Sequence, residues 1–382
     1  MRNPFGKAGT IVILVGIVVI LCAEILLDLT PPISRDALIH HLAIPKLWLL
    51  HGGVYEIPWA VYSYYPMNIN ILYLIPLYFG NDVLPKFIHW SFGLGIALMI
   101  YAYLEKRLGK TWGFLGILVF ISTPLVVRLS TSAYIDLGMV FFVSASIMAW
   151  VTWRQNDYKD KKWLLISAVC MGLAVGSKYN AMLAWFFVNL ALVFHLSRDT
   201  GKSAHALKTG ALFFAITLII ASPWFVKNLI LTGNPVYPLF GGFFNYIHGV
   251  VSGTGNSGGS DVAGWADNIF QRRAVMFGEN FWEVLLIPVR IFFQGQDDSF
   301  RYFDGVLNPI LLLMTPFAFF KKDYRHDKMF FLLFTGFFFM IAYFTEVIRV
   351  RYILPIIPFL TILSMRPLHN SDRHFSRGRD SL

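Results

Sequence analysis

Charged residues are scarce in this sequence: Asp, Glu, Lys and Arg make up 14% of its 382 residues, against roughly 25% in soluble domains. Hydrophobic residues make up 56%. A soluble domain of this length cannot bury so much apolar surface, and a disordered chain would be far more polar, so both classes are excluded. The same apolar content excludes a disulfide-stabilised scaffold. The two cysteines, Cys22 and Cys170, both lie in apolar runs and so report nothing about the redox compartment. The class that remains is a membrane protein with several spans.

Apolar runs occur throughout the chain, and most approach the length of about 17–25 residues that a helix needs to cross a bilayer. They cover residues 9–29, 84–104, 111–128, 135–153, 163–177, 180–197, 209–225, 305–320, 329–346 and 350–365. We therefore expect an all-α polytopic membrane protein with about ten transmembrane helices. The shorter run at 67–80 is typical of a re-entrant or interfacial segment. The first run lacks a small-x-small cleavage site, which predicts a retained anchor rather than a signal peptide.

Basic residues gather in every second connection between these runs. Those segments are the N-terminus with Arg2 and Lys7, then 105–110, 154–162, 198–208, 321–328 and the tail from Arg366. Together they hold 20 of the 32 basic residues and 8 of the 22 acidic residues. This positive-inside pattern predicts that both termini are cytoplasmic and that the other loops face outward. The formal net charge of +10 is thus a topology signal and implies no nucleic-acid partner.

The order of runs and loops predicts six regions. They are an N-terminal anchor helix (1–29), a first external loop with juxtamembrane helices (30–83), a transmembrane core (84–225), a second large external loop (226–304), C-terminal transmembrane helices (305–365) and a basic cytoplasmic tail (366–382). Residues 249–264 are rich in Gly and Ser, which predicts a mobile loop of unknown role.

Ionisable residues outside the cytoplasmic segments gather at the predicted outer ends of spans. They are Asp36, Arg128, Asp136, Lys178, Lys227, Glu346, Arg349 and Arg351. Such a collection suits the binding of an anionic headgroup, with a carboxylate available for proton transfer. The alternative is that each side chain simply extends from its span into water, which accounts for any one of them but less well for the whole set.

The segment 34–53 is predicted to form an amphipathic helix on the membrane surface, broken near Pro45. Asp36 and His40 are four residues apart and so share one face of that helix. Asp36 is a candidate general base, with His40 or His41 orienting it or binding substrate. The structural alternative makes Asp36 a helix N-cap. A metal cluster of Asp36, His40 and His41 is a third interpretation, but no further ligand motif lies nearby.

Six stretches resemble the GT-C superfamily of membrane glycosyltransferases, which use polyprenyl-phosphate-linked sugars, and within it the protein mannosyltransferases and the aminoarabinose transferase. The matching stretches are 35–53 (RDALIHHLAIPKLWLLHGG), 62–73 (YSYYPMNINILY), 130–142 (STSAYIDLGMVFF), 172–182 (GLAVGSKYNAM), 222–240 (SPWFVKNLILTGNPVYPLF) and 349–360 (RVRYILPIIPFL). They follow the order of the family and cover most of the chain. The resemblance implies a GT-C-like fold in the cytoplasmic membrane of a bacterium or archaeon, with the active site on the extracytoplasmic face.

The resemblance also implies roles for single residues. Asp36 is expected to be the catalytic aspartate that deprotonates the acceptor as it attacks the anomeric carbon, with inversion there. The substrate-binding residues implied beside it are Asp136, Lys178, Lys227, Arg351, Tyr352, His40, His41 and Tyr65. The lysines and Arg351 correspond to cations around the lipid phosphate. Tyr65 and Pro66 match a Tyr-Pro-Pro-Leu turn of the family, although Met67 replaces the second proline.

Three functions follow from these patterns. The first is a glycosyltransferase that moves a sugar from a polyprenyl phosphate to an extracytoplasmic acceptor. The second is a non-enzymatic transporter or flippase for a lipid-linked glycan, and the third is a structural membrane subunit. The expected partners are membrane lipids, the polyprenyl-phosphate-linked sugar and an acceptor that the sequence does not identify. No cofactor is expected apart from a divalent metal, for which the sequence offers no ligand set. Trp59, Tyr62 and Tyr64 suit either sugar stacking or an interfacial aromatic belt.

Overall fold

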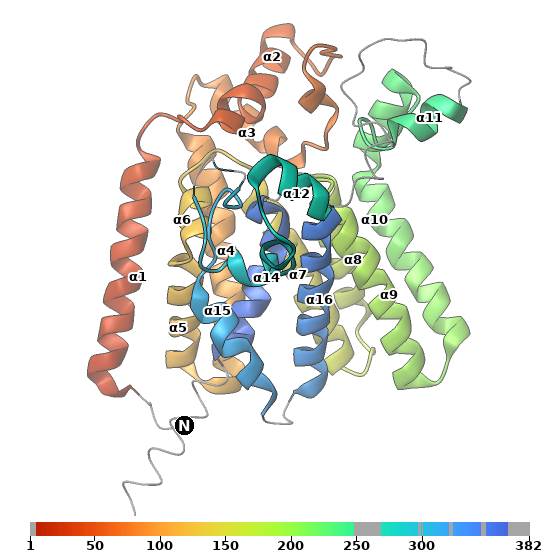
Figure 1. Cartoon of the computed structure of the whole chain (residues 1–382). Coiled ribbons are helices and arrows are strands. Elements are labelled where there is room, and N and C mark those ends of the chain that lie inside the picture. The colour runs from red at the N-terminus through yellow and green to blue at the C-terminus, as the bar shows by residue number, and fades with distance from the viewer. Residues whose placement is uncertain are drawn as a thin grey trace, which may run out of the picture. The chain divides into compact units, whose positions relative to one another are not determined.

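The computed structural model describes residues 5–247, 269–296, 299, 301–320, 324–344 and 349–365 (Figure 1). Within these residues every regular element is a helix, apart from one β-bridge between Gln296 and Phe303. The predicted all-α class is therefore confirmed. The chain divides into two compact units. The first unit contains Met1–Pro32, Lys86–Ala145 and Phe281–Leu382, and the second contains Ile33–Pro85 and Ser146–Asn280.

Five helices of the described residues are long and apolar enough to cross a membrane. They are α1 (Gly6–Asp28), α4 (Leu84–Leu108), α7 (Asp136–Gln155), α9 (Ala181–Thr200) and α10 (Ser203–Thr232). The pair α5 (Lys110–Ile121) and α6 (Pro124–Ser130) makes a sixth if it is one span, bent by 73°. The bend follows from Pro124, because the residue before a proline avoids helical geometry, and Thr123 is extended (φ −65°, ψ 122°). The protein is an integral membrane protein, and the long helices of its described residues account for five or six of the predicted spans.

The remaining predicted spans coincide with other helices of the described chain. These are α8 (Lys161–Val175), α15 (Pro309–Met314) with η4 (Thr315–Phe319), α16 (Arg325–Phe344) and an apolar helix at Val350–Met365 that begins as η5 (Val350–Ile356). The count of about ten spans is not confirmed and stays a prediction. The short run at 67–80 forms α3 (Asn68–Tyr78), whose 11 residues are too few to cross a bilayer.

The second large loop of the sequence contains four short helices in its described part. They are α11 (Gly241–Ile247), α12 (Ile269–Phe277), α13 (Phe281–Leu285) and α14 (Ile287–Arg290). The Gly/Ser-rich stretch 249–264, Glu346 and the basic tail from Arg366 lie outside the described residues.

In the second unit, α10 packs along both α8 and α9 (Figure 1). Gly172 of α8 allows a close approach, since a Cβ atom there would lie 2.5 Å from Ile220 Cβ of α10. Thr217 Oγ1 of α10 also donates a 3.2 Å hydrogen bond to the carbonyl of Ala168. Small residues and interhelical hydrogen bonds of this kind hold membrane helices together where lipid is as apolar as the side chains. This packing fixes the α8–α9 turn, which carries Lys178.

The first external segment is helical, but its break differs from the prediction. Residues Ala37–His41 form the π-helix η1, and α2 runs over Ala43–His51. The helix is interrupted at Leu42, whereas Pro45 lies inside the first turn of α2. The expectation of a break near Pro45 is therefore wrong by one turn. A proline is tolerated in a first turn because amide groups there lack an acceptor within the helix.

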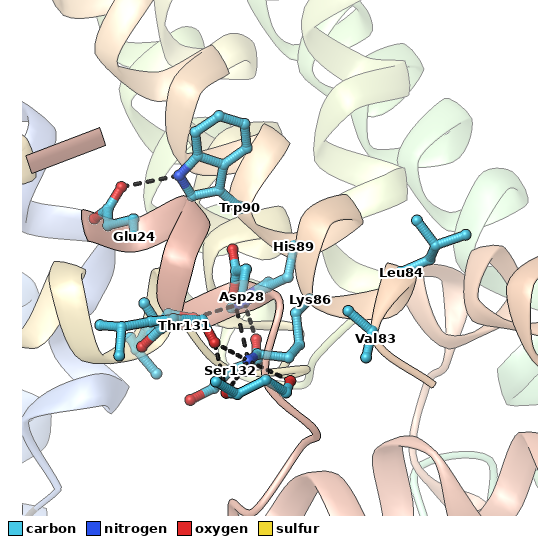
Figure 2. Close-up of polar contacts among 12 residues, drawn as sticks. Glu24, Asp28, Val83, Leu84, Lys86, His89, Trp90, Thr131 and Ser132 are labelled. Carbon is cyan, nitrogen blue, oxygen red and sulfur yellow. Dashed lines mark hydrogen bonds and ion pairs between the residues drawn. The ribbon is translucent and has the colours of Figure 1, made fainter. Parts of the chain in front are cut away.

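In the first unit, two acidic side chains near the end of α1 are buried against α4 (Figure 2). The indole N–H of Trp90 donates a 2.9 Å hydrogen bond to Glu24 Oε2. Lys86 Nζ lies 3.7 Å from Asp28 Oδ1 and donates a 2.7 Å hydrogen bond to the carbonyl of Leu27. Because a helix ends with carbonyls that lack amide partners, the ammonium caps α1 and ties it to α4.

Candidate functional site

Asp36 immediately precedes the π-helix η1 and is half-buried. Its side chain makes no capping hydrogen bond to the helix amides. The interpretation of Asp36 as an N-cap is therefore not supported. Single turns of π-helix are rare and frequently occur at functional sites. The π geometry arises locally, since Leu42 N–H donates to the carbonyl of Ala37, five residues back, at 2.8 Å.

The two histidines of η1 have different environments, which the sequence did not separate. His41 is buried, and its Nδ1 atom lies 3.2 Å from Asn70 Nδ2, which also donates a 3.0 Å hydrogen bond to the His41 carbonyl. Because the Asn70 amide can only donate, His41 Nδ1 accepts and its proton is on Nε2. His40 is half-buried and stacks on Tyr62 with ring centroids 4.3 Å apart. His41 therefore supports the fold, and His40 is the better candidate for ligand contact.

Five tyrosines of the second unit, here called the tyrosine cluster, surround the same region. They are Tyr62, Tyr64, Tyr65, Tyr179 and Tyr237. Tyr65 bridges the set, with ring centroids 5.9 Å from Tyr62 and 5.4 Å from Tyr179. Burial raises the pKa of the Tyr64 and Tyr179 phenols well above their usual range, so both remain neutral hydroxyls. Aromatic faces with neutral hydroxyls suit a sugar ring.

Lys227 of α10 is half-buried beside the tyrosine cluster. Its ammonium donates a 2.6 Å hydrogen bond to the carbonyl of Ser63. The same nitrogen lies 5.1 Å from the ring centroid of Trp224 and 5.9 Å from that of Tyr64. The described residues place no carboxylate in an ion pair with it, so its charge is available to an anion.

Side-chain amides hold this region together, and sequence reasoning missed them. Asn228 Nδ2 donates to the Tyr64 carbonyl at 2.8 Å and to the Tyr179 hydroxyl at 3.1 Å. Asn68 Oδ1 accepts from the Trp224 indole at 2.7 Å. Gly176 makes room for Asn68, since a Cβ atom there would lie 2.2 Å from Asn68 Nδ2. These hydrogen bonds join residues 49 to 164 positions apart, so no local pattern signals them.

The second unit thus brings together several residues that the sequence singled out. Tyr65 contacts Tyr179, which follows Lys178 in the α8–α9 turn. Lys227 contacts the segment that carries Tyr65. His40 contacts Tyr62 from η1, which follows Asp36, and His41 supports that helix.

The other predicted residues lie in the first unit. Asp136 is fully buried as the first residue of α7. Arg351 is half-buried, with its guanidinium carbon 5.5 Å from the ring centroid of Tyr134 and 5.8 Å from that of Tyr352. Arg128 Nη1 is paired with Asp304 Oδ1 at 3.0 Å. Arg128 therefore has a structural partner within the first unit.

The described residues contain no group of three His, Cys, Asp or Glu side chains close enough to hold a metal ion. The interpretation of Asp36, His40 and His41 as a metal cluster has no ligand set among them.

A family described as "Domain of unknown function (DUF8201)" matches residues 82–358, which is most of the chain. The chain belongs to this family. No curated protein matches the sequence.

Solved structures resemble this DUF8201 protein over almost its whole length. ArnT from Cupriavidus metallidurans bound to undecaprenyl phosphate superposes with a TM-score of 0.64 and 16% identity, covering 95% of this chain and 60% of ArnT. The Archaeoglobus fulgidus oligosaccharyltransferase in its apo form superposes with a TM-score of 0.54 and 13% identity, covering 98% of this chain and 52% of the enzyme. The structure of archaeal AglB from the same organism, in complex with an inhibitory peptide and a dolichol-phosphate, superposes with a TM-score of 0.54 and 13% identity, covering 97% of this chain and 51% of AglB. The resemblance to the GT-C fold of membrane glycosyltransferases is confirmed.

At these identities the likeness establishes the fold alone. The DUF8201 chain spans 60% of the length of ArnT and about half of the oligosaccharyltransferase. Its activity, substrates and partners therefore belong to the proposal that follows.

Proposed function

We propose that the protein is a glycosyltransferase that moves a sugar from a polyprenyl-phosphate carrier to an acceptor outside the cytoplasm. The fold supports this proposal, because ArnT and AglB share it and have been solved with undecaprenyl phosphate and with a dolichol-phosphate. The single observation that carries it is the half-buried ammonium of Lys227, held between aromatic faces and one carbonyl beside the tyrosine cluster. A cation so placed lacks an anion of its own and suits a phosphate.

Asp36 serves as the general base in this proposal. Its carboxylate takes the proton of the acceptor hydroxyl or amine while that nucleophile attacks the anomeric carbon. The bond between that carbon and the phosphate oxygen breaks, its electron pair remains on the phosphate, and the configuration inverts. A base in hydrogen-bond reach of its proton contributes about 10²–10⁴-fold to such a reaction.

Cations stabilise the charge that develops on the departing phosphate. Lys227 and Lys178 of the second unit are proposed to do so, and Arg351 and Tyr352 of the first unit keep the phosphate-binding and substrate-binding roles that the resemblance implies for them. Preorganised charges of this kind cost no reorganisation at the moment of reaction. Asp136 is proposed to bind substrate, and Tyr65 and His40 to offer ring faces to the sugar.

The finer topology also belongs to the proposal. We place both termini in the cytoplasm and the site on the extracytoplasmic face, with about ten spans and with η1, α2 and α3 at the membrane surface. The basic segments support this orientation. A lipid-linked donor suits that location, because an activated sugar reaches the outer face on a membrane carrier.

The test is native mass spectrometry of the detergent-purified protein, first for retained lipid and then in a titration with undecaprenyl phosphate. The proposal expects uptake by the wild-type protein and about tenfold weaker binding by Lys227→Met, Lys178→Ala and Arg351→Ala, since each removes a charged hydrogen-bond donor. Lys46→Ala is the matched control, because Lys46 is exposed and pairs with Asp82 on the surface. A wild-type protein that carries bulk phospholipid and takes up no undecaprenyl phosphate would contradict the proposal.

A further inference from the structure

His89 of α4 is fully buried and bonds to both sides of the turn that joins α6 to α7. Its Nδ1 atom lies 3.0 Å from the carbonyl oxygen of Leu129 and 2.9 Å from that of Ser132. Its Nε2 atom accepts a 2.9 Å hydrogen bond from the backbone N–H of Leu137. Figure 2 shows His89 beside Ser132, in the same polar region of α4 as Lys86.

These partners fix the tautomer of His89. Two carbonyl oxygens require a donor at Nδ1, and a backbone N–H requires an acceptor at Nε2. The ring is therefore neutral, with its proton on Nδ1. In this form it gives a second donor to the carbonyls of Leu129 and Ser132, which also accept from the backbone N–H groups of Ser132 and Tyr134. It also gives an acceptor to the Leu137 amide in the first turn of α7, where amides lack an acceptor within the helix. One side chain thus links the end of α6 to the start of α7.

The backbone of α4 is shaped to bring the imidazole close to the turn. Gly93, one helical turn after His89, lies on the same face of α4. A Cβ atom at Gly93 would lie 3.3 Å from Leu137 Cδ1 and 3.5 Å from Ser130 Oγ. The close packing at Gly93 is thus a second observation, separate from the hydrogen bonds of His89, that places α4 against the residues that flank the turn.

The turn held in this way carries Asp136, a proposed substrate-binding residue of the first unit, and Tyr134, which contacts another, Arg351. Tyr134 lies within it, and its ring supports the Arg351 guanidinium. Asp136 lies at the end of the turn, immediately before Leu137, whose backbone N–H donates to His89 Nε2. His89 holds the backbone that carries Tyr134 and Asp136. A substitution of His89 is therefore expected to displace Asp136 and, through Tyr134, Arg351, although His89 itself does not contact the substrate.

We infer that His89 is a positioning residue, which holds the 129–137 turn so that Tyr134 places Arg351 for the lipid phosphate and Asp136 for the substrate. This inference rests on the proposed function. His89 differs from a general packing residue in that both ring nitrogens are required, one as a donor and one as an acceptor.

The first experiment needs no ligand. Hydrogen exchange followed by mass spectrometry is compared for the wild-type protein, His89→Asn, His89→Gln and the control Ile96→Ala, a fully buried residue of α4 without polar atoms. We expect faster exchange across residues 133–140 in His89→Asn, whose shorter amide reaches the Nδ1 position alone, and partial protection in His89→Gln, whose amide reaches Leu137. Unchanged exchange in both His89 variants would overturn the inference, whatever the function.

The second experiment is a double-mutant cycle with undecaprenyl phosphate as the probe. We expect His89→Gln to weaken binding about fivefold in the wild-type background and to add no further loss in the Arg351→Ala background, because coupled residues are not additive. Ile96→Ala should bind as the wild type does. Equal losses from His89→Gln in both backgrounds would overturn the inference. Absence of uptake by the wild-type protein would instead contradict the proposed function, and with it the ligand part of this inference.

Discussion

Lys86 in the first unit and Lys227 in the second are two lysines withdrawn from water whose partners differ. Lys86 is 3% exposed, lies 3.7 Å from Asp28 and donates to two backbone carbonyls, those of Leu27 and Thr30. Lys227 is half-buried and donates to one carbonyl, with aromatic rings beside it. The first ammonium has a counter-charge within the protein, and the described residues give the second none.

This difference separates a structural cation from a candidate binding cation better than position in the sequence does. A buried charge that has a counter-charge beside it is already stabilised inside the fold. Removal of one partner leaves the other buried and uncompensated, which destabilises the protein. A charge held by a carbonyl and ring faces gains most from an external anion. Arg128 resembles Lys86 in this respect, because it is paired with Asp304.

The largest effect on stability is expected at the paired lysine. Lys86→Met should lower the free energy of unfolding by about 3 kcal/mol, because it leaves Asp28 buried without a counter-charge. Thermal unfolding in detergent measures this change. The double variant Lys86→Met/Asp28→Asn should recover much of the loss, and a double variant as unstable as the sum of its single changes would contradict the pairing.

Lys227→Met should show the opposite profile. Binding of undecaprenyl phosphate should weaken about tenfold, which corresponds to about 1.4 kcal/mol, while the unfolding free energy changes by less than about 1 kcal/mol. The titration by native mass spectrometry and the unfolding curve together measure both quantities. If Lys227→Met keeps its affinity for undecaprenyl phosphate but loses stability, Lys227 is a structural cation like Lys86, and the proposed difference between the two lysines is wrong.

A smaller contrast is expected within η1. His41→Ala should destabilise the protein by about 1–2 kcal/mol, because it removes a partner of the buried Asn70 side chain. His40→Ala should leave stability nearly unchanged and slow sugar transfer, since its ring stacks on Tyr62 at the edge of the tyrosine cluster. Thermal unfolding and a transfer assay separate the two variants. Equal effects of both on stability would contradict the division.

The smallest effect is expected at Lys46. Its ammonium lies 3.8 Å from Asp82, with the two side chains 49% and 45% exposed. Lys46→Ala should change the unfolding free energy by no more than about 0.5 kcal/mol, because water and salt screen exposed pairs. A loss of several kcal/mol, measured in the same unfolding assay, would show that exposure is a poor guide to the role of a lysine here.

Hydropathy located the helices of this fold well. The first anchor, the bent segment at 111–128 and the non-spanning run at 67–80 all coincide with helices, because burial in lipid imposes long apolar runs that a single sequence displays. The break in the first external segment was misplaced, since a proline in a first helical turn causes no interruption. Composition predicted only the class, an all-α membrane protein, whereas the resemblance of short stretches to the GT-C superfamily predicted the particular fold.

The partners within each unit were beyond local patterns. Lys86 reaches Leu27 from 59 residues away, and Asn228 reaches Tyr64 from 164 residues away. His89 stood in an apolar run without any motif, although a lone histidine in a membrane helix is a signal in itself. The sequence could predict charged residues near the ends of helices. It could not predict which cation already has a partner, because that depends on contacts between distant segments.

The most direct test of the account concerns Asp36. Sugar transfer from undecaprenyl phosphate carrying a radiolabelled hexose or pentose is measured for the wild-type protein and for Asp36→Asn, beside binding of undecaprenyl phosphate. The account predicts that the variant loses transfer by at least about a hundredfold while its affinity for the lipid changes by less than about twofold, since the amide keeps the shape and cannot take a proton. Full transfer by Asp36→Asn would contradict the account. Loss of lipid binding in Asp36→Asn, without transfer by the wild-type protein, would favour a transporter of a lipid-linked glycan instead.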